Sequence, residues 1–238
     1  MRLSQRIHDI CSCVSQGESI ADIGTDHAYV PMRLIKDGIS DYAIMSDISE
    51  GSLAKAVETF ELAHIDYDEN QFRLGDGLEK IDFSEVDDII IAGLGGYTII
   101  DILKADLAKS KSFKKLILQP RKFSGNLRHF LYTNGWDIVS EKLSPEGKFV
   151  CEIITATPSD EQSRHAPFDE NNIRWKYPET FINADKTLLK QRLDWKFSSI
   201  DEEIQNLSNS KTDNKELIDK LLLDKTNLKD LLDKSNNA

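Results

Sequence analysis

The strongest constraint on the fold is the regular alternation of short apolar runs with amphipathic stretches up to about residue 158. Six runs rich in Ile, Leu and Val cover residues 19–23, 42–45, 86–91, 115–118, 136–139 and 150–155. Stretches with helical periodicity separate the early runs, at 31–38, 50–63 and 97–109. Strands that alternate with helices form βαβ units, so the sequence predicts a mostly parallel α/β sheet.

The last two apolar runs indicate a different connection. Gly135, Pro145 and Gly147 punctuate them, and no helical pattern lies between them. Two strands joined in this way form an antiparallel hairpin, which suits the edge of the sheet. A Rossmann-like α/β sheet that closes with such a hairpin resembles the layout of the class I methyltransferases.

The pattern changes after Pro158. Residues 159–178 are polar and contain two prolines, so we expect a connector with little regular structure. Apolar residues then recur at steps of three and four over 189–207 and 217–232, separated by the polar segment 208–214. This spacing predicts two helices that form an antiparallel coiled-coil hairpin. We expect two domains, 1–158 and 159–238, with the helical arm standing free; the alternative is a helix pair packed on the first domain.

Composition and charge exclude several classes of protein. The chain carries 30 Lys+Arg against 41 Asp+Glu and a net charge of -11, the wrong sign for coating nucleic acid nonspecifically. No apolar run reaches the roughly 18 residues of a membrane span. The three cysteines are odd in number and irregularly spaced, so they indicate neither a disulfide framework nor a zinc site. We therefore expect a cytoplasmic protein without a metal centre.

The most informative motif is Ile20-Ala-Asp-Ile-Gly-Thr-Asp-His-Ala-Tyr-Val-Pro31, which runs from a strand through a glycine turn into a helix. Gly24 permits a tight turn and close approach of a ligand to the backbone. A dinucleotide site would need G-x-G-x-x-G here, whereas this chain has one glycine followed by Thr25, Asp26 and His27. Asp26 would repel a pyrophosphate but tolerate a sulfonium. The motif therefore favours S-adenosyl-L-methionine over NAD.

Further ligand-binding residues follow the next predicted strands. Asp47 closes the second run, where a carboxylate can accept hydrogen bonds from ribose hydroxyls. Asp76, between Gly75 and Gly77, suits the exocyclic amine of adenine. The later segment Ala92-Gly-Leu-Gly-Gly96 lies at a strand end, where ligands bind in open α/β sheets, and it lacks the Gly-Lys-Ser/Thr ending of a phosphate-binding loop.

Taken together, these motifs resemble the bacterial tRNA (adenine-22-N1)-methyltransferase family over about residues 1–158. The resemblance rests on four segments, Asp22–Pro31, Arg73–Gly77, Ala92–Gly96 and Gln119-Pro120. The helical hairpin is similar in kind to the C-terminal arm of that family. Two positions depart from the family pattern: Arg121 follows Gln-Pro in place of Asn, and Leu94 stands in place of Met.

The resemblance implies methyl transfer from S-adenosyl-L-methionine to N1 of adenine 22 in the D-arm region of tRNA, by a monomer. The implied cofactor-binding residues are Asp22, Gly24, Asp26, His27, Asp47, Asp76, Gly77 and Gly93. Asp26, His27 and Gly93 are also assigned to the chemical step, although His27 can equally cap a helix. Two alternatives remain: a nucleotide-binding Rossmann module whose arm contacts other proteins, and a methyltransferase acting on a small molecule or a protein.

Any surface that binds RNA must be local, because residues 1–158 and 159–238 carry net charges of -8 and -3. The candidate cations are Arg121, Lys122 and Arg128 in the first part, Lys190 and Arg192 in the arm, and Arg2 and Arg6 near the N-terminus. Tyr29 and Tyr97 are candidates for base stacking or for packing, and we expect Asp87 and Asp88 to be surface acids. We also expect removal of residues 159–238 to weaken tRNA binding more than cofactor binding.

Overall fold

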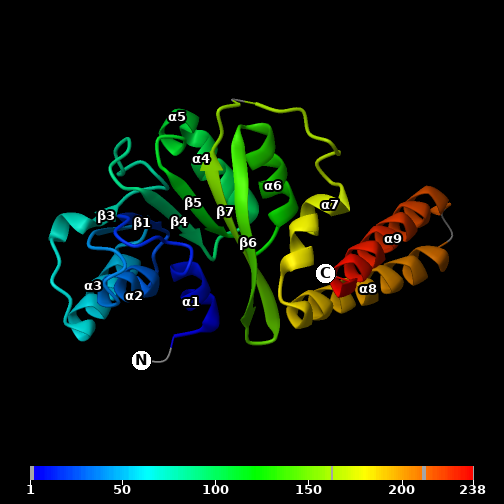
Figure 1. The fold of residues 1–238 in the computed structure, drawn as a ribbon, viewed down its shortest axis with the longest axis horizontal. Helices are drawn as coiled ribbons and strands as arrows, with labels where there is room; N and C mark the ends of the chain where they lie inside the picture. Colours follow the sequence, from blue (N-terminus) through cyan, green and yellow to red (C-terminus); the bar gives the residue numbers. More distant parts are fainter. Residues whose placement is uncertain (1–2, 162, 211–212, 238) are drawn as a thin grey trace.

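The computed structural model describes residues 3–161, 163–210 and 213–237. Its strands are β1 (Ile20–Ile23), β2 (Ala43–Asp47), β3 (Phe72–Leu74), β4 (Asp88–Ala92), β5 (Lys115–Gln119), β6 (Trp136–Glu146) and β7 (Phe149–Pro158) (Figure 1). Its main helices are α1 (Gln5–Cys11), α2 (Tyr29–Lys36), α3 (Glu50–Ala63), α4 (Gly96–Ala105), α5 (Leu107–Ser110), α6 (Ser124–Thr133), α7 (Ile173–Lys176), α8 (Lys186–Ser208) and α9 (Lys215–Asn237).

The strands form one sheet in the order β3-β2-β1-β4-β5-β7-β6. The first five strands in this order, from β3 to β5, are all parallel to their neighbours. Strand β7 runs antiparallel to β5, and β6 runs antiparallel to β7. The predicted Rossmann-like sheet with its antiparallel closing hairpin is therefore confirmed. The short strand β3, which no long apolar run marks, is held by its pairing with β2.

Helices cover both faces of the sheet, which explains why its strands are apolar throughout. On one face, α4 and α6 pack against alternate residues of β1, β4 and β5, such as Ile89 and Leu116. On the other face, α1, α2 and α3 pack against the intervening residues, such as Ile90 and Ile117. The loops that leave the carboxyl ends of the parallel strands therefore meet at one edge.

The connector after Pro158 is more ordered than its composition predicts. It contains α7, and Ile173, Trp175 and Tyr177 are each less than 10% exposed. These apolar side chains pack beside α6 and the hairpin, so the expectation of little regular structure is wrong for this part. Composition does not predict this short buried segment, because most of the residues around it are polar.

The C-terminal helices α8 and α9 lie side by side and project from the sheet domain (Figure 1). Their base is not free. Leu189, Leu193 and Leu228 share one apolar cluster with Leu143 of β6, so the near end of the arm packs on the hairpin. The arm is thus anchored at its base, contrary to the free-standing expectation. None of the helices in the described segments has the length and apolarity needed to cross a membrane.

Candidate cofactor site at the carboxyl edge of the sheet

Two glycine turns lie against each other where β1 and β4 end. Gly24 has a φ of +77° and Gly93 a φ of +82°, a region that side chains disfavour. The Gly24 N–H donates to the Ser46 carbonyl at 2.8 Å, which ties the first turn to β2. A Cβ added at Gly24 would lie 3.5 Å from Leu94 Cδ1, so the two turns are in close contact. Both glycines are partly exposed to solvent at this edge.

Asp22 lies inside β1, behind these turns. Its neighbours across the sheet are Met45 and Ile90, and the residue is only 7% exposed. Burial raises the pKa of its carboxyl to about 6, and the nearby Asp47 adds to the increase, whereas the Thr25 side chain and Arg6 lower the pKa. Asp22 is therefore a buried acid directly behind the Gly24 turn, and its role toward the cofactor stays a prediction.

Asp47 and Asp76 follow adjacent strands. The Ser49 N–H donates to Asp47 Oδ1 at 2.8 Å, and the Gly75 N–H donates to the Asp47 carbonyl at 3.1 Å, so the two acid-bearing turns are joined. Gly77 has a φ of +51°, and a Cβ there would lie 3.0 Å from Ile102 Cγ2. Glycine is therefore required to form the turn that presents the exposed Asp76.

Asp26 and His27 form a small polar cluster with a partner that sequence analysis missed. Lys55 of α3 lies 2.7 Å from Asp26 Oδ1, and His27 Nε2 lies 3.5 Å from Asp26 Oδ2. The hydrogen bond from Lys55 holds the pKa of Asp26 below its ordinary value. The His27 ring stacks on Tyr29 with centroids 5.0 Å apart. No sequence signal links Lys55 to this turn, because the two are 29 residues apart.

Arg6 reaches the edge from α1. Its Nη1 donates to Gln119 Oε1 at 3.1 Å, and its Nε lies 2.7 Å from Glu146 Oε2. Its side chain is 18% exposed, so the expected basic patch of Arg2 and Arg6 is wrong for Arg6, while Arg2 lies outside the described residues. The contact fixes the orientation of the Gln119 amide at the end of β5.

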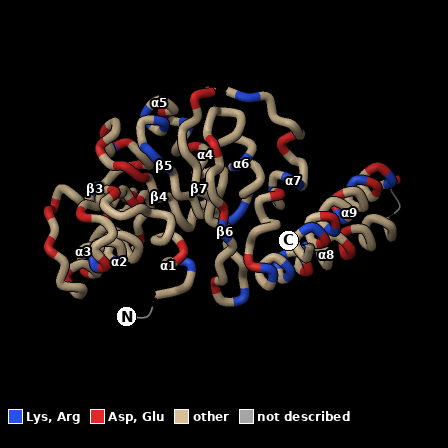
Figure 2. Tube along the Cα trace, in the orientation of Figure 1, with Lys and Arg blue, Asp and Glu red and all other residues tan. Residues whose placement is uncertain are grey.

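The candidate RNA-binding cations divide into two groups. Arg121 and Lys122 are exposed at the edge, and Arg121 Nε lies 3.7 Å from the position of a Cβ on Gly93. Lys190 is also exposed and pairs with Asp194 at 2.5 Å. Figure 2 shows Lys and Arg alternating with Asp and Glu over most of α8 and α9.

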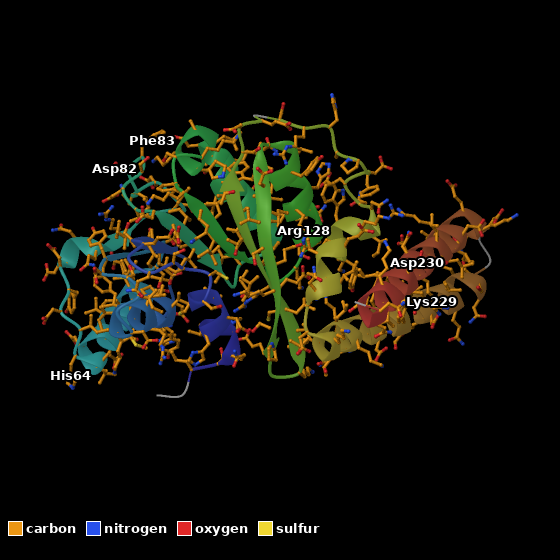
Figure 3. The ribbon with its side chains drawn as sticks, in the orientation of Figure 1. His64, Asp82, Phe83, Arg128, Lys229 and Asp230 are labelled. Carbon is orange, nitrogen blue, oxygen red and sulfur yellow. The ribbon has the colours of Figure 1, made fainter. Side chains whose placement is uncertain are left out.

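Arg128 and Arg192 are corrections to the predicted RNA-binding set. The Arg128 side chain is 1% exposed and lies inside the molecule, 2.5 Å from Glu141 and 2.6 Å from Glu152 (Figure 3). Arg192 of α8 also pairs with Glu152 and is 16% exposed. Neither guanidinium is available to RNA, because both are used to neutralise buried carboxylates.

The expectation that Asp88 is a surface acid is also wrong. Asp88 is fully buried at the start of β4, 3.0 Å from Lys115 Nζ. Asp87 is paired instead with Lys114 at 2.6 Å. Both acids lie at the amino end of β4, away from the edge described above.

The carboxyl edge fits S-adenosyl-L-methionine. Asp47 and Asp76 follow β2 and β3 at the carboxyl edge, where open α/β sheets bind ligands, and the turns at Gly24 and Gly93 lie at the same edge. The acidic surroundings are compatible with a sulfonium and unfavourable to a pyrophosphate. Within the described segments, no three His, Cys, Asp or Glu side chains gather in a way that would hold a metal ion.

Comparisons with known proteins agree with this geometry. A methyltransferase domain family matches residues 3–154. The tRNA (adenine(22)-N(1))-methyltransferase of Bacillus subtilis is 32% identical over 169 residues, covering 71% of this chain and 69% of the relative. The crystal structure of the B. subtilis tRNA methyltransferase TrmK superposes with a TM-score of 0.78 at 26% identity, covering 97% of this chain and 99% of the other.

A third match links the fold to a bound cofactor. The Streptococcus pneumoniae protein Sp1610, in complex with S-adenosyl-L-methionine, has a TM-score of 0.71 and 28% identity and covers 97% of this chain and 100% of its own. The likeness extends over the arm as well as the sheet domain, since nearly the whole chain is covered. This chain therefore belongs to the tRNA (adenine(22)-N(1))-methyltransferase family of class I methyltransferases.

Proposed function

We propose that this protein transfers the methyl group of S-adenosyl-L-methionine to N1 of the adenine at position 22 in the D-arm region of tRNA. The carrying observation is the 32% identity to a B. subtilis enzyme whose name states that reaction. We further propose that the protein acts as a monomer and, because tRNA is its substrate, in the cytoplasm. The glycine turns and carboxylates at the sheet edge support the cofactor part of the proposal.

The chemistry needs positioning more than acid–base catalysis. When bound, S-adenosyl-L-methionine supplies a sulfonium methyl group that the in-plane lone pair of adenine N1 attacks in line, breaking the carbon–sulfur bond. Asp47 and Asp76 hold the adenosine end, and the turns at Gly24 and Gly93 let the reacting groups approach the backbone. The methylated base gains a positive charge, which the ionised carboxylate of Asp26 stabilises.

The target base must leave its stack before it reaches the edge. Extrusion of a nucleotide from folded nucleic acid costs a few kcal/mol, which contacts with the protein must offset. Arg121 and Lys122 are exposed beside Gly93 and supply positive charge where the RNA backbone would pass. The negative total charge of the chain makes these local cations the relevant ones.

The direct test uses purified protein, labelled S-adenosyl-L-methionine and unmodified bacterial tRNA. We expect label in 1-methyladenosine at position 22 and none in a tRNA with guanine at that position. Asp47→Asn should weaken cofactor binding at least tenfold, while the matched control Asp41→Asn, an exposed acid before the other end of β2, should not. Cofactor binding without transfer to any tRNA would refute the substrate; absence of cofactor binding would favour the nucleotide-binding alternative.

A further inference from the structure

An exposed pair of aromatic side chains lies beside the cofactor edge, and the proposed function assigns no role to either ring. Tyr97 is 46% exposed and Phe123 is 53% exposed. Their ring centroids are 4.7 Å apart with an interplanar angle of 47°. Tyr97 follows the glycine-rich end of β4 directly, and Phe123 follows the loop at the end of β5. Tyr97 is the second residue of α4 and Phe123 immediately precedes α6, so the pair lies at the starts of the helices that follow β4 and β5.

The backbone holds Phe123 in an unusual conformation. Its φ of 59° and ψ of 35° are left-handed, a region that bulky side chains rarely adopt. The Gly96 N–H donates to the Lys122 carbonyl at 2.8 Å, and a Cβ on Gly96 would lie 2.4 Å from the Phe123 carbonyl oxygen. The two loops are thus pressed together at a glycine. This contact fixes two aromatic rings on the surface, although burial would be favourable for both.

Two cations accompany the rings. Arg121 and Lys122 immediately precede Phe123, and both are exposed. Neither has a carboxylate partner among the described residues, whereas Lys55 at the same edge is paired with Asp26. The Arg121 N–H donates to the Leu94 carbonyl at 2.8 Å, which fixes this part of the loop. Exposed π-faces beside unpaired cations match the bases and phosphates of a single-stranded nucleic acid.

We propose that Tyr97 and Phe123 form a stacking platform for an unstacked base of the RNA substrate, with Arg121 and Lys122 binding the adjoining phosphates. This inference rests on the proposed function, because it assumes that the substrate is RNA. An apolar peptide would cover the rings but leave both cations without a counter-charge. RNA satisfies the rings and the cations together, which is why it is the occupant that the observations favour.

The test compares variants that keep the backbone and change the ring. Phe123→Asn removes the ring and retains a residue that tolerates the left-handed conformation, while Phe123→Trp retains an aromatic face. The matched control is Phe83→Asn. Phe83 is 57% exposed and has Lys109 Nζ 5.8 Å from its ring centroid, but it lies in the loop before β4, near the opposite edge (Figure 3).

The measurements are dissociation constants for unmodified tRNA, from fluorescence anisotropy, and for S-adenosyl-L-methionine, from calorimetry. Loss of one stacked base should weaken tRNA binding by about 5- to 150-fold in Phe123→Asn. Phe123→Trp should stay within about threefold of the wild type, and so should Phe83→Asn. Cofactor affinity should not change in any variant. In turnover assays, the KM for tRNA should rise more than kcat falls.

Two results would overturn the platform. One is a dissociation constant for tRNA that is the same in Phe123→Asn as in the wild type. This is the result expected if the rings contact a protein instead of RNA. The other is equal loss in Phe123→Asn and Phe123→Trp, which would point to the backbone instead of the ring. Failure of the proposed function is a separate outcome, namely a wild type that methylates no tRNA. Binding of an oligoadenylate probe to the same variants then still decides whether the rings stack bases.

Discussion

Arg128→Met should be among the most destabilising single substitutions in this protein. The Arg128 guanidinium is 1% exposed and bridges Glu141 of β6 and Glu152 of β7, whose side chains are 2% and 5% exposed. Its Nη1 also donates to the Trp175 carbonyl at 3.0 Å. Methionine fills similar space but leaves a buried carboxylate without its partner.

The magnitude follows from the burial of the partners. Removing one member of a buried ion pair costs about 3–5 kcal/mol, because the remaining charge stays desolvated. For a protein of 150–250 residues, each kcal/mol lowers Tm by about 2–4 °C, so we expect a decrease of about 6–20 °C. Scanning calorimetry, supported by urea unfolding, measures both quantities.

A second variant separates charge from packing. Glu152 retains Arg192 when Arg128 is lost, whereas the Thr180 hydroxyl is the one side-chain partner that Glu141 keeps among the described residues. Adding Glu141→Gln to Arg128→Met should therefore recover most of the lost stability, since no buried charge then lacks a partner. The control is Arg33→Met, which breaks an exposed pair with Asp37 and should cost at most about 1 kcal/mol. The reasoning would be refuted if Arg128→Met lowered the free energy of unfolding by less than about 1 kcal/mol. It would also be refuted if the double variant were less stable than Arg128→Met alone.

Two further predictions concern pH and loop packing. Burial raises the pKa of Asp88 from 3.8 to about 7, so the folded protein binds more protons than the unfolded chain in this range and stability falls as pH rises through it. In Asp88→Asn, the slope of the free energy of unfolding against pH should become less negative by up to about 1.4 kcal/mol per pH unit between pH 4 and 7. An unchanged slope would contradict the raised pKa of Asp88. Gly96→Ala should lower Tm, measured by calorimetry, and weaken tRNA binding, measured by fluorescence anisotropy, because the added Cβ would lie 2.4 Å from the Phe123 carbonyl oxygen. The control is Gly95→Ala, whose added Cβ has space and should change neither quantity.

Sequence reasoning was most successful where local pattern and fold agree. The apolar runs become β1, β2, β4 and β5 because both faces of a parallel sheet are covered and need no alternation. The turns at Gly24 and Gly93 are recognisable because a positive φ at a strand end calls for glycine. Asp47 follows from its place at the end of a predicted strand, and Asp76 from its place between Gly75 and Gly77, because no strand is predicted before it. Their roles at the cofactor remain predictions.

Side-chain pairing over long sequence separations escaped the same reasoning. Sequence analysis predicts surface positions for Arg128 and Asp88, because charged residues are mostly exposed. Their burial depends on partners 24 and 27 residues away, Glu152 and Lys115, which no periodicity reveals. Tyr97 shows the same limit: it lies in α4, its partner Phe123 lies in the loop before α6, and the close packing at Gly96 brings the two rings together.

The anchored arm changes how its function must be tested. Arg192 of α8 pairs with Glu152, and Glu152 accepts a hydrogen bond from the Ser124 hydroxyl at 3.1 Å, next to Phe123 of the platform. Removal of residues 159–238 would take away Arg192 and the apolar cover of Leu143, so it would destabilise β6, β7 and the start of α6 together. A deletion would then lower tRNA binding whether or not the arm contacts RNA. Lys190 is exposed and pairs with Asp194 of the same helix, so its substitution changes the charge of the arm without touching the anchor and is the informative experiment.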